Sequence, residues 1–186
     1  MNHLGTQRLG TDRLILRPFV AEDIPHAFRN WVSDPDVTAY LTWPAHPDIG
    51  VTEHVVRDWL SRYPSPDYYQ WAIELKSLGQ PIGSIAVVSS LEEGPLSVAT
   101  IGYCMGKPWW GQGLMPEALR AVRDFLFDRV GYGCIQARHD VNNPKSGRVM
   151  SKAGMTRAGI LRRAAVNNQG VVDEVVYDML PSDPRL

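Results

Sequence analysis

The alternation of hydrophobic and polar positions divides the chain into short elements, and the clearest succession begins at residue 101. Residues 101–105 form an apolar run that predicts a buried strand, and a connector rich in glycine and tryptophan follows at 106–113. Apolar residues then recur at steps of three and four from Met115 to Val130, which predicts one face of an amphipathic helix. The sequence therefore predicts a strand, a tight turn and a helix in direct succession.

The same patterning predicts strands on both sides of this unit. The first is partly buried and ends at Pro18, and the last two meet at a turn formed by residues 167–170. Apolar or alternating runs bounded by turn residues define the others. The predicted strands are 8–19, 71–75, 82–88, 96–105, 134–138, 155–166 and 171–180.

Three further helices are predicted from apolar spacing and capping residues. Residues 22–31 repeat apolar side chains at helical steps until the segment around Pro35 breaks the pattern. Thr52 can cap a helix that continues to residue 60. Asn143 followed by Pro144 provides a side-chain cap and then a proline at the first helical position, so a helix is expected there.

Composition indicates one soluble domain. The chain has 186 residues, of which 44% are hydrophobic and 21% charged, as in ordinary globular proteins. No apolar run approaches the ~18 residues of a membrane-spanning helix, and the amino terminus lacks an apolar signal region, so a cytoplasmic protein is expected. Cys104 and Cys134 lie in apolar runs and are interpreted as reduced core residues. The five histidines show no metal-ligand spacing, so no metal is expected.

The net charge of −1 conceals an uneven distribution along the chain. Residues 1–100 hold 7 Lys and Arg against 12 Asp and Glu, whereas residues 101–186 hold 12 against 8. A ligand carrying several phosphates would favour the second part and an amine the first, although chance variation of the surface explains the difference equally well. No polybasic patch is present, so no nucleic-acid partner is expected.

The turn before the helix has the properties of an anion site. Gly111 and Gly113 can adopt positive φ and let a ligand come close, and the first N–H groups of a helix have no partner within it. Such a turn binds phosphate-type anions, although a plain loop or helix cap would have the same glycines. The Walker pattern fails because Gln112 follows Gly111, and the dinucleotide pattern fails because Pro116 stands where a third glycine is needed.

Residues 110–115, Trp-Gly-Gln-Gly-Leu-Met, resemble the acetyl-CoA loop of the GNAT acetyltransferase superfamily, which reads Gln/Arg-x-x-Gly-x-Gly/Ala. Gly113 matches its central glycine, while Trp110 and Met115 depart from it in a way that resembles the RimJ/RimL branch. The opening strand and the Asn143-x-x-Ser146 helix resemble the same branch, so the likeness covers roughly residues 8–180. It implies a single-domain α/β (α+β) fold over 1–186, with a mixed, mostly antiparallel sheet of about seven strands flanked by about four helices.

The resemblance implies an N-acetyltransferase that moves the acetyl group of acetyl-CoA directly to a primary amine, on a small molecule or a protein N-terminus. It implies that a backbone N–H near Cys104 or Met105 binds the oxyanion, that Asn143 contacts the pantetheine arm, and that Ser146 lies near the sulfur and protonates the thiolate. The expected acetyl-CoA-binding residues are Cys104, Met105, Gly111, Gln112, Gly113, Leu114, Met115, Asn143 and Ser146.

The acceptor and the general base stay open. The resemblance places the acceptor pocket between the first two predicted strands, where aromatic residues and His46 could either line a pocket or pack the helices. The candidates there are Tyr40, Trp43, His46, Tyr63 and Tyr68. Some relatives carry a glutamate base at the position of Ala165, so Glu74, which is also a candidate acceptor contact, His139 and water remain as bases. The alternative is a catalytically inactive acetyl-CoA sensor or interaction module, and a monomer or a homodimer is expected.

Overall fold

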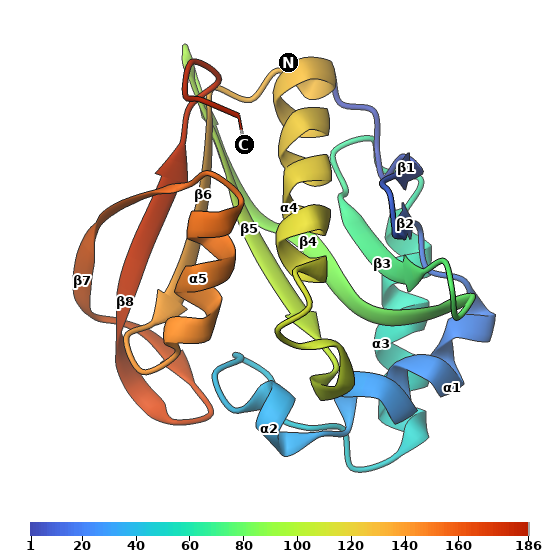
Figure 1. Ribbon diagram of the computed structural model, residues 1–186. Coiled ribbons are helices and arrows are strands. Elements are labelled where there is room, and N and C mark those ends of the chain that lie inside the picture. Colours follow the sequence, from blue (N-terminus) through green and yellow to red (C-terminus); the bar gives the residue numbers. More distant parts are fainter. Residues whose placement is uncertain (186) are drawn as a thin grey trace.

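One sheet forms the centre of the structure, with the strand order β1-β2-β3-β4-β5-β6-β8-β7. The computed structural model describes residues 1–185 and has eight strands within them (Figure 1). All neighbouring strands pair antiparallel except β5 and β6, so the sheet is mixed and mostly antiparallel as the sequence predicts. The strands are β1 (Leu9–Gly10), β2 (Leu14–Arg17), β3 (Gln70–Leu75), β4 (Gln80–Glu93), β5 (Leu96–Met105), β6 (Cys134–Asp140), β7 (Thr156–Asn167) and β8 (Gly170–Met179).

The eighth strand arises at the amino terminus, where the prediction of one strand over residues 8–19 is wrong. The chain turns back after Gly10, and Leu9 pairs antiparallel with Leu16. Thr11 closes this turn, because its backbone N–H donates to the Leu14 carbonyl at 3.0 Å and its Oγ1 accepts from the Leu14 N–H at 3.0 Å. Threonine side chains compete with strand pairing in this way, so one alternating run becomes two strands.

Helices cover both faces of the sheet. In Figure 1, α4 and α5 lie in front of the sheet, α3 lies behind β3 and β4, and α1 lies beside α3 below the sheet. A 3₁₀ turn precedes α1, and a wider helical turn extends both α1 and α4. Within residues 1–185 the α-helices are α1 (Ile24–Ala27), α2 (Pro35–Thr38), α3 (Ile49–Arg62), α4 (Leu114–Phe125) and α5 (Pro144–Lys152).

Two details of the helices correct the prediction. The four-residue α2 was not expected, because Pro35 begins it immediately after the residues that end the preceding helix. The start of α3 is also earlier than predicted, since Asp48 and not Thr52 is its cap: Asp48 Oδ1 accepts from the Val51 N–H at 3.2 Å. Thr52 is buried one turn later, where its hydroxyl contacts His46 Nδ1 at 2.9 Å.

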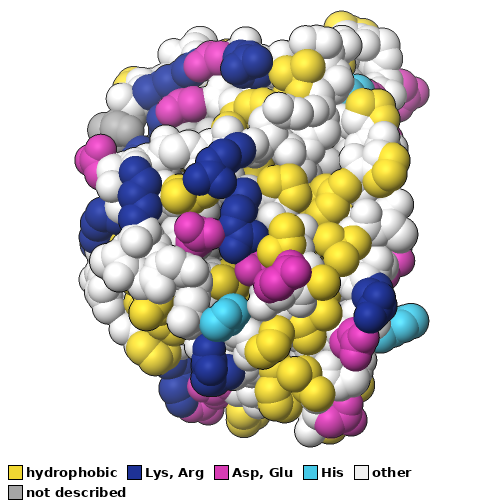
Figure 2. Space-filling view, turned by 90° about the vertical axis from the view of Figure 1, so that its right-hand side faces the viewer, with side chains coloured by type: hydrophobic (Ala, Val, Ile, Leu, Met, Phe, Trp, Pro, Cys, Tyr) yellow, Lys and Arg dark blue, Asp and Glu magenta, His cyan; other side chains and the backbone are white. Residues whose placement is uncertain are grey.

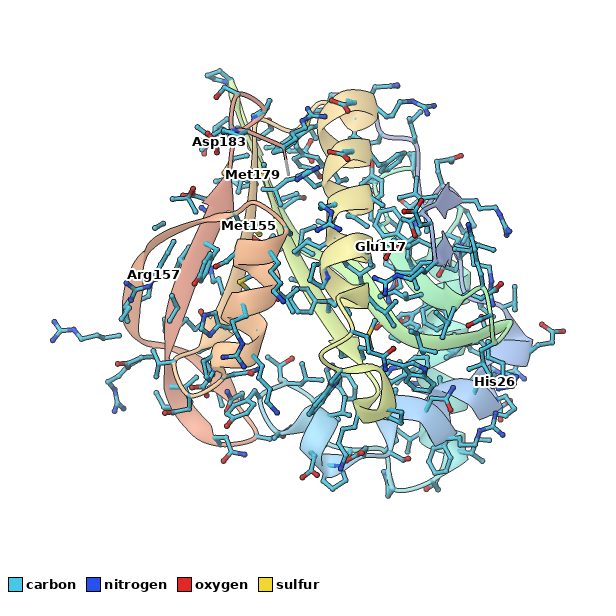
Figure 3. The ribbon with its side chains drawn as sticks, viewed as in Figure 1. His26, Glu117, Met155, Arg157, Met179 and Asp183 are labelled. Carbon is cyan, nitrogen blue, oxygen red and sulfur yellow. The ribbon has the colours of Figure 1, made fainter. Side chains whose placement is uncertain are left out.

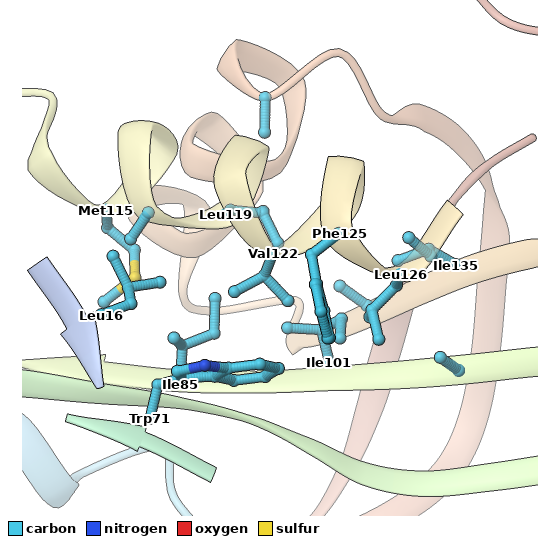
Figure 4. Packing of buried hydrophobic residues seen from close by; sticks show 14 of the residues in the cluster. Leu16, Trp71, Ile85, Ile101, Met115, Leu119, Val122, Phe125, Leu126 and Ile135 are labelled. Atoms are coloured by element: carbon cyan, nitrogen blue, oxygen red, sulfur yellow. The ribbon is translucent and has the colours of Figure 1, made fainter. Parts of the chain in front are cut away.

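The main core lies between the sheet and α4. Leu119 and Val122 on α4 face Trp71 and Ile101 on the sheet, and all four are almost fully buried (Figure 4). The apolar positions predicted to share one helix face are therefore the ones that pack on the sheet. A second cluster, which includes Trp31, fills the opposite face beneath α1 and α3.

The parallel pair β5–β6 separates before either strand ends. Its ladder runs from Val98↔Cys134 to Ile101↔Ala137, but β5 continues to Met105 and β6 to Asp140. The two strands diverge towards the ends that lead into α4 and α5, as Figure 1 shows. This divergence opens a gap in the sheet between the starts of two helices.

Candidate active site

The backbone of β5 faces the gap at Met105. The Gly106 N–H donates to the Ile82 carbonyl of β4 at 2.9 Å. Because backbone groups alternate in direction along an antiparallel pair, Cys104 points its N–H to β4, while Met105 points its N–H to the gap. The Met105 carbonyl already accepts the Trp110 indole N–H at 2.5 Å, which leaves the N–H as the group offered to a ligand.

The glycine turn has the backbone that the sequence predicts. Gly111 has φ 77° and Gly113 has φ 75°, both in the left-handed region that side chains disfavour. No side chain caps α4, and Pro116 in its first turn has no N–H to satisfy. The N–H groups of Leu114 and Met115 therefore begin the helix without a side-chain acceptor, an arrangement that fits an anion such as a pyrophosphate.

Residues from the amino-terminal turn support this helix start. The Arg13 backbone N–H and Nε donate to Glu117 at 2.9 and 2.7 Å, and Arg13 Nη1 donates to the Gln112 carbonyl at 3.0 Å. Thr11 Oγ1 donates to the same carboxylate at 2.5 Å. Burial alone would raise the pKa of Glu117, but the hydrogen bonds from Thr11 and Arg13 outweigh it and lower that pKa. Figure 3 shows Glu117 between α4 and β1–β2.

The first turn of α5 forms the other side of the gap. Asn143 Oδ1 accepts from the Ser146 N–H at 3.4 Å, so the predicted cap is present but long. Ser146 Oγ lies 2.9 Å from the hydroxyl of Tyr103 on β5, and the Tyr103 hydroxyl also donates to the Ser146 carbonyl at 3.0 Å. Lys145 Nζ lies 5.0 Å from the centre of the Trp110 ring, so α5 also contacts the segment between β5 and α4.

Two of the predicted acceptor residues lie beside the tip of the β7–β8 hairpin. Asn168 Nδ2 donates to the carbonyls of Thr38 and Trp43, each at 2.8 Å, and its backbone N–H donates to the Leu41 carbonyl at 3.1 Å. The segment that carries Tyr40 and Trp43 is thus fixed to the carboxyl-terminal hairpin. Tyr40 is exposed there, and the Trp43 ring is half-buried.

The other aromatic candidates have structural partners. The Tyr63 hydroxyl accepts from the Phe19 N–H and donates to the Gln70 carbonyl, both at 2.8 Å. Tyr68 packs against Tyr63, beyond the end of α3 that is remote from Trp43. His46 is buried against Thr52, and this burial lowers its pKa. Of these three residues, His46 stays beside the predicted acceptor segment, since its ring centre lies 5.4 Å from that of Trp43, whereas Tyr63 and Tyr68 have partners at the other end of α3.

The two candidate bases are both engaged elsewhere. Glu74 accepts from Arg17 Nε at 2.7 Å, and the same guanidinium holds Asp23 with contacts of 2.7 and 2.9 Å. His139 is buried and donates from Nδ1 to the Asp140 carbonyl at 2.7 Å. Its Nε2 faces α5 at Gly147, where an added Cβ would lie only 2.6 Å away.

With this geometry in place, comparison with known proteins decides the family. The family model described as "Acetyltransferase (GNAT) domain" matches residues 13–156. The chain belongs to the GNAT acetyltransferase family. Its match includes the glycine turn, the separated strands and the start of α5, and the chain is accordingly an acyltransferase.

Relatives of this GNAT protein extend over nearly its whole length. The uncharacterized N-acetyltransferase YoaA of Bacillus subtilis is 27% identical over 172 residues, 92% of this chain and 96% of that protein. The ribosomal-protein-S5-alanine acetyltransferase of Vibrio fischeri has a TM-score of 0.81 at 15% identity, covering 95% of this chain and 98% of that one. RimJ of Mycobacterium smegmatis in complex with CoA-disulfide has a TM-score of 0.81 at 20% identity, covering 94% and 88%. At these identities the two structural likenesses are those of the fold.

The surroundings of Cys104 disfavour a cysteine nucleophile in this GNAT enzyme. Cys104 is a free thiol 3.4 Å from Ser84 Oγ, and burial raises its pKa, so the nucleophilic thiolate is disfavoured. Among residues 1–185, no group of three His, Cys, Asp or Glu side chains is arranged to hold a metal ion. No helix in that range is long and apolar enough to cross a membrane. The face drawn in Figure 2 carries positive and negative side chains interspersed.

The sequence prediction missed Thr11, Arg13, Tyr103 and Asn168. Period-two alternation places Tyr103 on the same face as Ile101 and Met105, so its direction could have been predicted. Its contact with Ser146 on α5 could not have been predicted, because that contact depends on how far β5 and β6 separate. The contacts of Thr11 and Arg13 likewise depend on the turn at Thr11. Those of Asn168 depend on the length of the β7–β8 hairpin.

Proposed function

We propose that this protein moves the acetyl group of acetyl-CoA directly to a primary amine. The observation that carries the proposal is the gap beyond Ile101↔Ala137, bordered by an uncapped glycine turn on one side and Ser146 on the other. A long thiol carrying a pyrophosphate needs both features, an anion-binding end and backbone groups freed from strand pairing near the reacting carbonyl. The chain's membership of the GNAT family, whose members use acetyl-CoA, supports the same assignment.

The proposed cofactor contacts follow from the direction of backbone groups. The pyrophosphate accepts from the N–H groups of the turn, the pantetheine arm lies beside Asn143, and the thioester carbonyl points to the Met105 N–H. Because Cys104 points its N–H towards β4, Met105 is the better oxyanion donor of the two. The residues of the turn that take part are Gly111, Gln112, Gly113, Leu114 and Met115.

The transfer itself replaces the C–S bond of the thioester by a C–N bond. The neutral amine attacks the thioester carbon, the C–N bond forms, and the C–S bond breaks with its electron pair remaining on sulfur. The amine loses a proton to water, since Arg17 holds Glu74 and His139 faces Gly147. Ser146 gives its hydroxyl proton to the sulfur and regains one from water. A thiol titrates near ~8.5, so the thiolate is a fair leaving group and needs modest help.

The acceptor is a primary amine on a small molecule or a protein N-terminus. We propose that it approaches between the segment with Tyr40 and Trp43 and the hairpin tip at Asn168, because these elements meet beside the gap.

The acetyltransferase domain takes in the whole chain, 1–186, since β8 pairs with β6 and so completes the sheet beyond the matched residues.

A panel of amines incubated with acetyl-CoA tests this function. The panel should contain peptides with different N-termini, polyamines, amino acids and amine drugs, and mass spectrometry should report any acetylated product. We expect at least one amine to be acetylated, at a rate proportional to the enzyme concentration. Tight CoA binding with no transfer to any amine class would contradict the proposal and favour the acetyl-CoA sensor.

A further inference from the structure

Tyr103 connects β5 to the first turn of α5 beside the gap. It lies two residues beyond Ile101, the last residue of β5 that pairs with β6. Its hydroxyl is 2.9 Å from Ser146 Oγ and 3.0 Å from the Ser146 carbonyl, in the first turn of α5. Among the residues that face the gap, Tyr103 thus contacts the serine to which the proposed function gives a proton-transfer role.

The surroundings of Tyr103 keep its hydroxyl a hydrogen-bond donor. The ring packs against the core beneath α4, on the same face of β5 as Ile101 and Met105. Burial raises the pKa of the Tyr103 phenol, so the hydroxyl stays protonated through the neutral range. A neutral phenol has one proton to donate, while the Ser146 hydroxyl has one proton and two lone pairs.

We propose that Tyr103 is a positioning residue that fixes the Ser146 hydroxyl in the rotamer from which its proton reaches the CoA sulfur. The proposal rests on the proposed function. The one phenol proton can point to the Ser146 carbonyl at 3.0 Å or to Ser146 Oγ at 2.9 Å. In the second orientation Tyr103 occupies a lone pair of Oγ and leaves the serine proton free for the sulfur. As the C–S bond breaks, its electron pair stays on sulfur and the Ser146 proton joins it, while Tyr103 keeps its own proton.

The size of the effect follows from rotamer freedom. A serine side chain has three staggered wells, and without Tyr103 it distributes among them. If only one well is productive, the productive fraction falls to about a third, or to less where the other wells are preferred. Removing the Tyr103 hydroxyl should therefore lower kcat about three- to tenfold, which is less than removing the serine oxygen itself.

A purely mechanical role for Tyr103 is the competing explanation. The bond from its hydroxyl to the Ser146 carbonyl does not involve the serine side chain. A tyrosine that merely joined β5 to α5 through this carbonyl would matter equally whether or not residue 146 carries a hydroxyl. The two roles therefore differ in the background of a Ser146→Ala substitution.

A double-mutant cycle makes this distinction. Tyr103→Phe keeps the ring and should lower kcat about three- to tenfold with the acetyl-CoA KM unchanged within twofold. Ser146→Ala should lower kcat about ten- to a hundredfold, and adding Tyr103→Phe to it should produce no further loss. Tyr177→Phe is the matched control, because the Tyr177 hydroxyl also faces α5, near Gly147, but forms no hydrogen bond with Ser146 in the described structure, and it should leave kcat unchanged. Thermal melting checks that every variant is folded.

Crystal structures with CoA give a readout that does not depend on turnover. In the wild-type complex Ser146 should occupy one rotamer directed at the sulfur, and in the Tyr103→Phe complex it should occupy more than one. Equal losses of kcat from Tyr103→Phe in both backgrounds, or one unchanged rotamer in both complexes, would overturn the inference. Those outcomes would leave the proposed function standing, because the wild-type protein would still acetylate an amine. Wild-type protein that binds CoA but acetylates no amine would instead contradict the proposed function, so the two failures are distinguishable.

Discussion

At the scale of single residues, two thiol environments differ: that of the protein's own Cys104, which packs on the second cluster beneath α1 and α3, and that expected for CoA bound in the gap. The Cys104 side chain contacts Ser84 on β4, and burial raises its pKa. The Met105 N–H, the Asn143 amide and the Ser146 hydroxyl are instead polar groups next to the gap. Direct transfer from sulfur to nitrogen therefore suits this site better than transfer through a cysteine.

Replacing Cys104 tests that view. Cys104→Ala should retain acetyl transfer within about tenfold, because the thiol takes no part in the chemistry and only a small buried volume is lost. Steady-state kinetics and intact-protein mass spectrometry after incubation with acetyl-CoA measure this. An acetyl group found on Cys104 during turnover would show that transfer is not direct.

Replacing Asn143 should separate binding from folding. Asn143→Ala removes both the proposed pantetheine contact and the cap of α5, so the acetyl-CoA KM should rise while the protein loses about 0.5–1 kcal/mol of stability. The low value is expected because the capping bond is 3.4 Å long. Asp48→Ala, which removes the cap of α3 away from the gap, is the matched control and should lower stability alone. An unchanged KM with a lower melting temperature would leave Asn143 as a cap only.

At the scale of elements, α4 begins where two distant parts of the chain meet. The turn at Thr11–Arg13 donates to Glu117, and Arg13 also contacts the Gln112 carbonyl within the glycine turn. The amino-terminal strands therefore help to set the geometry of the proposed anion site. Sequence patterning predicted the helix and its glycines, but not this support, which depends on the chain turning back at Thr11.

The Glu117 contacts should make stability depend on pH in a defined direction. The pKa of Glu117 is lowered in the folded protein, so its contribution is present above the unfolded value near ~4.3 and is lost as pH falls through the folded pKa. Glu117→Gln should cost about 1 kcal/mol at neutral pH, or about 2–4 °C in Tm. The difference in Tm from wild type should shrink in acid.

A surface pair provides the control for Glu117. Glu53 pairs with Arg57 one turn along α3, and both side chains are largely exposed. Glu53→Gln should change Tm by less than about 1 °C, since exposed pairs of this kind contribute little. Equal effects of the two substitutions at neutral pH, or a Glu117→Gln difference that grows in acid, would contradict the role given to Glu117.

The β7–β8 hairpin is the element that should affect the acceptor amine. Asn168 fixes its tip to the segment containing Tyr40 and Trp43 through two side-chain hydrogen bonds. Asn168→Ala should raise the KM for the amine severalfold and leave the acetyl-CoA KM unchanged, which serves as the internal control. A rise in both constants would show that the hairpin tip acts on the whole fold and not on the acceptor side.

At the scale of the whole molecule, the sequence predicts the regular helices and strands well, and the turns and contacts that join distant segments poorly. Apolar periodicity correctly identifies the face of α4, and the turn residues locate β3, β4 and β5, because local backbone preferences decide these features. The four-residue α2, the turn at Thr11 and the Tyr103–Ser146 contact were missed. Each depends on tertiary packing between segments far apart in the chain, which no local pattern encodes.

In the proposed site, too, the sequence predicts the local backbone but not the contacts between distant segments. Gly111 and Gly113 have the positive φ that the turn requires, so sequence reasoning predicted the conformation of the turn that we propose holds the anion. Glu74 and His139 were candidates only by residue type, and their contacts with Arg17 and Asp140 could not be foreseen. The choice between Cys104 and Met105 depended on the pairing of β5 with β4.

The central claim is that the glycine turn beside the gap holds the pyrophosphate of acetyl-CoA, and calorimetric titration with CoA tests it most directly. Gly113→Val places a β-branched residue at φ 75° in the turn, whereas Gly79→Val places one at φ 66° in the turn between β3 and β4, where an added Cβ meets nothing within 4 Å. Both substitutions carry a similar backbone cost of about 1–2 kcal/mol, so thermal melting should show similar stability. We expect Gly113→Val to abolish CoA binding and Gly79→Val to bind like wild type. Unchanged affinity of folded Gly113→Val protein for CoA would contradict the account.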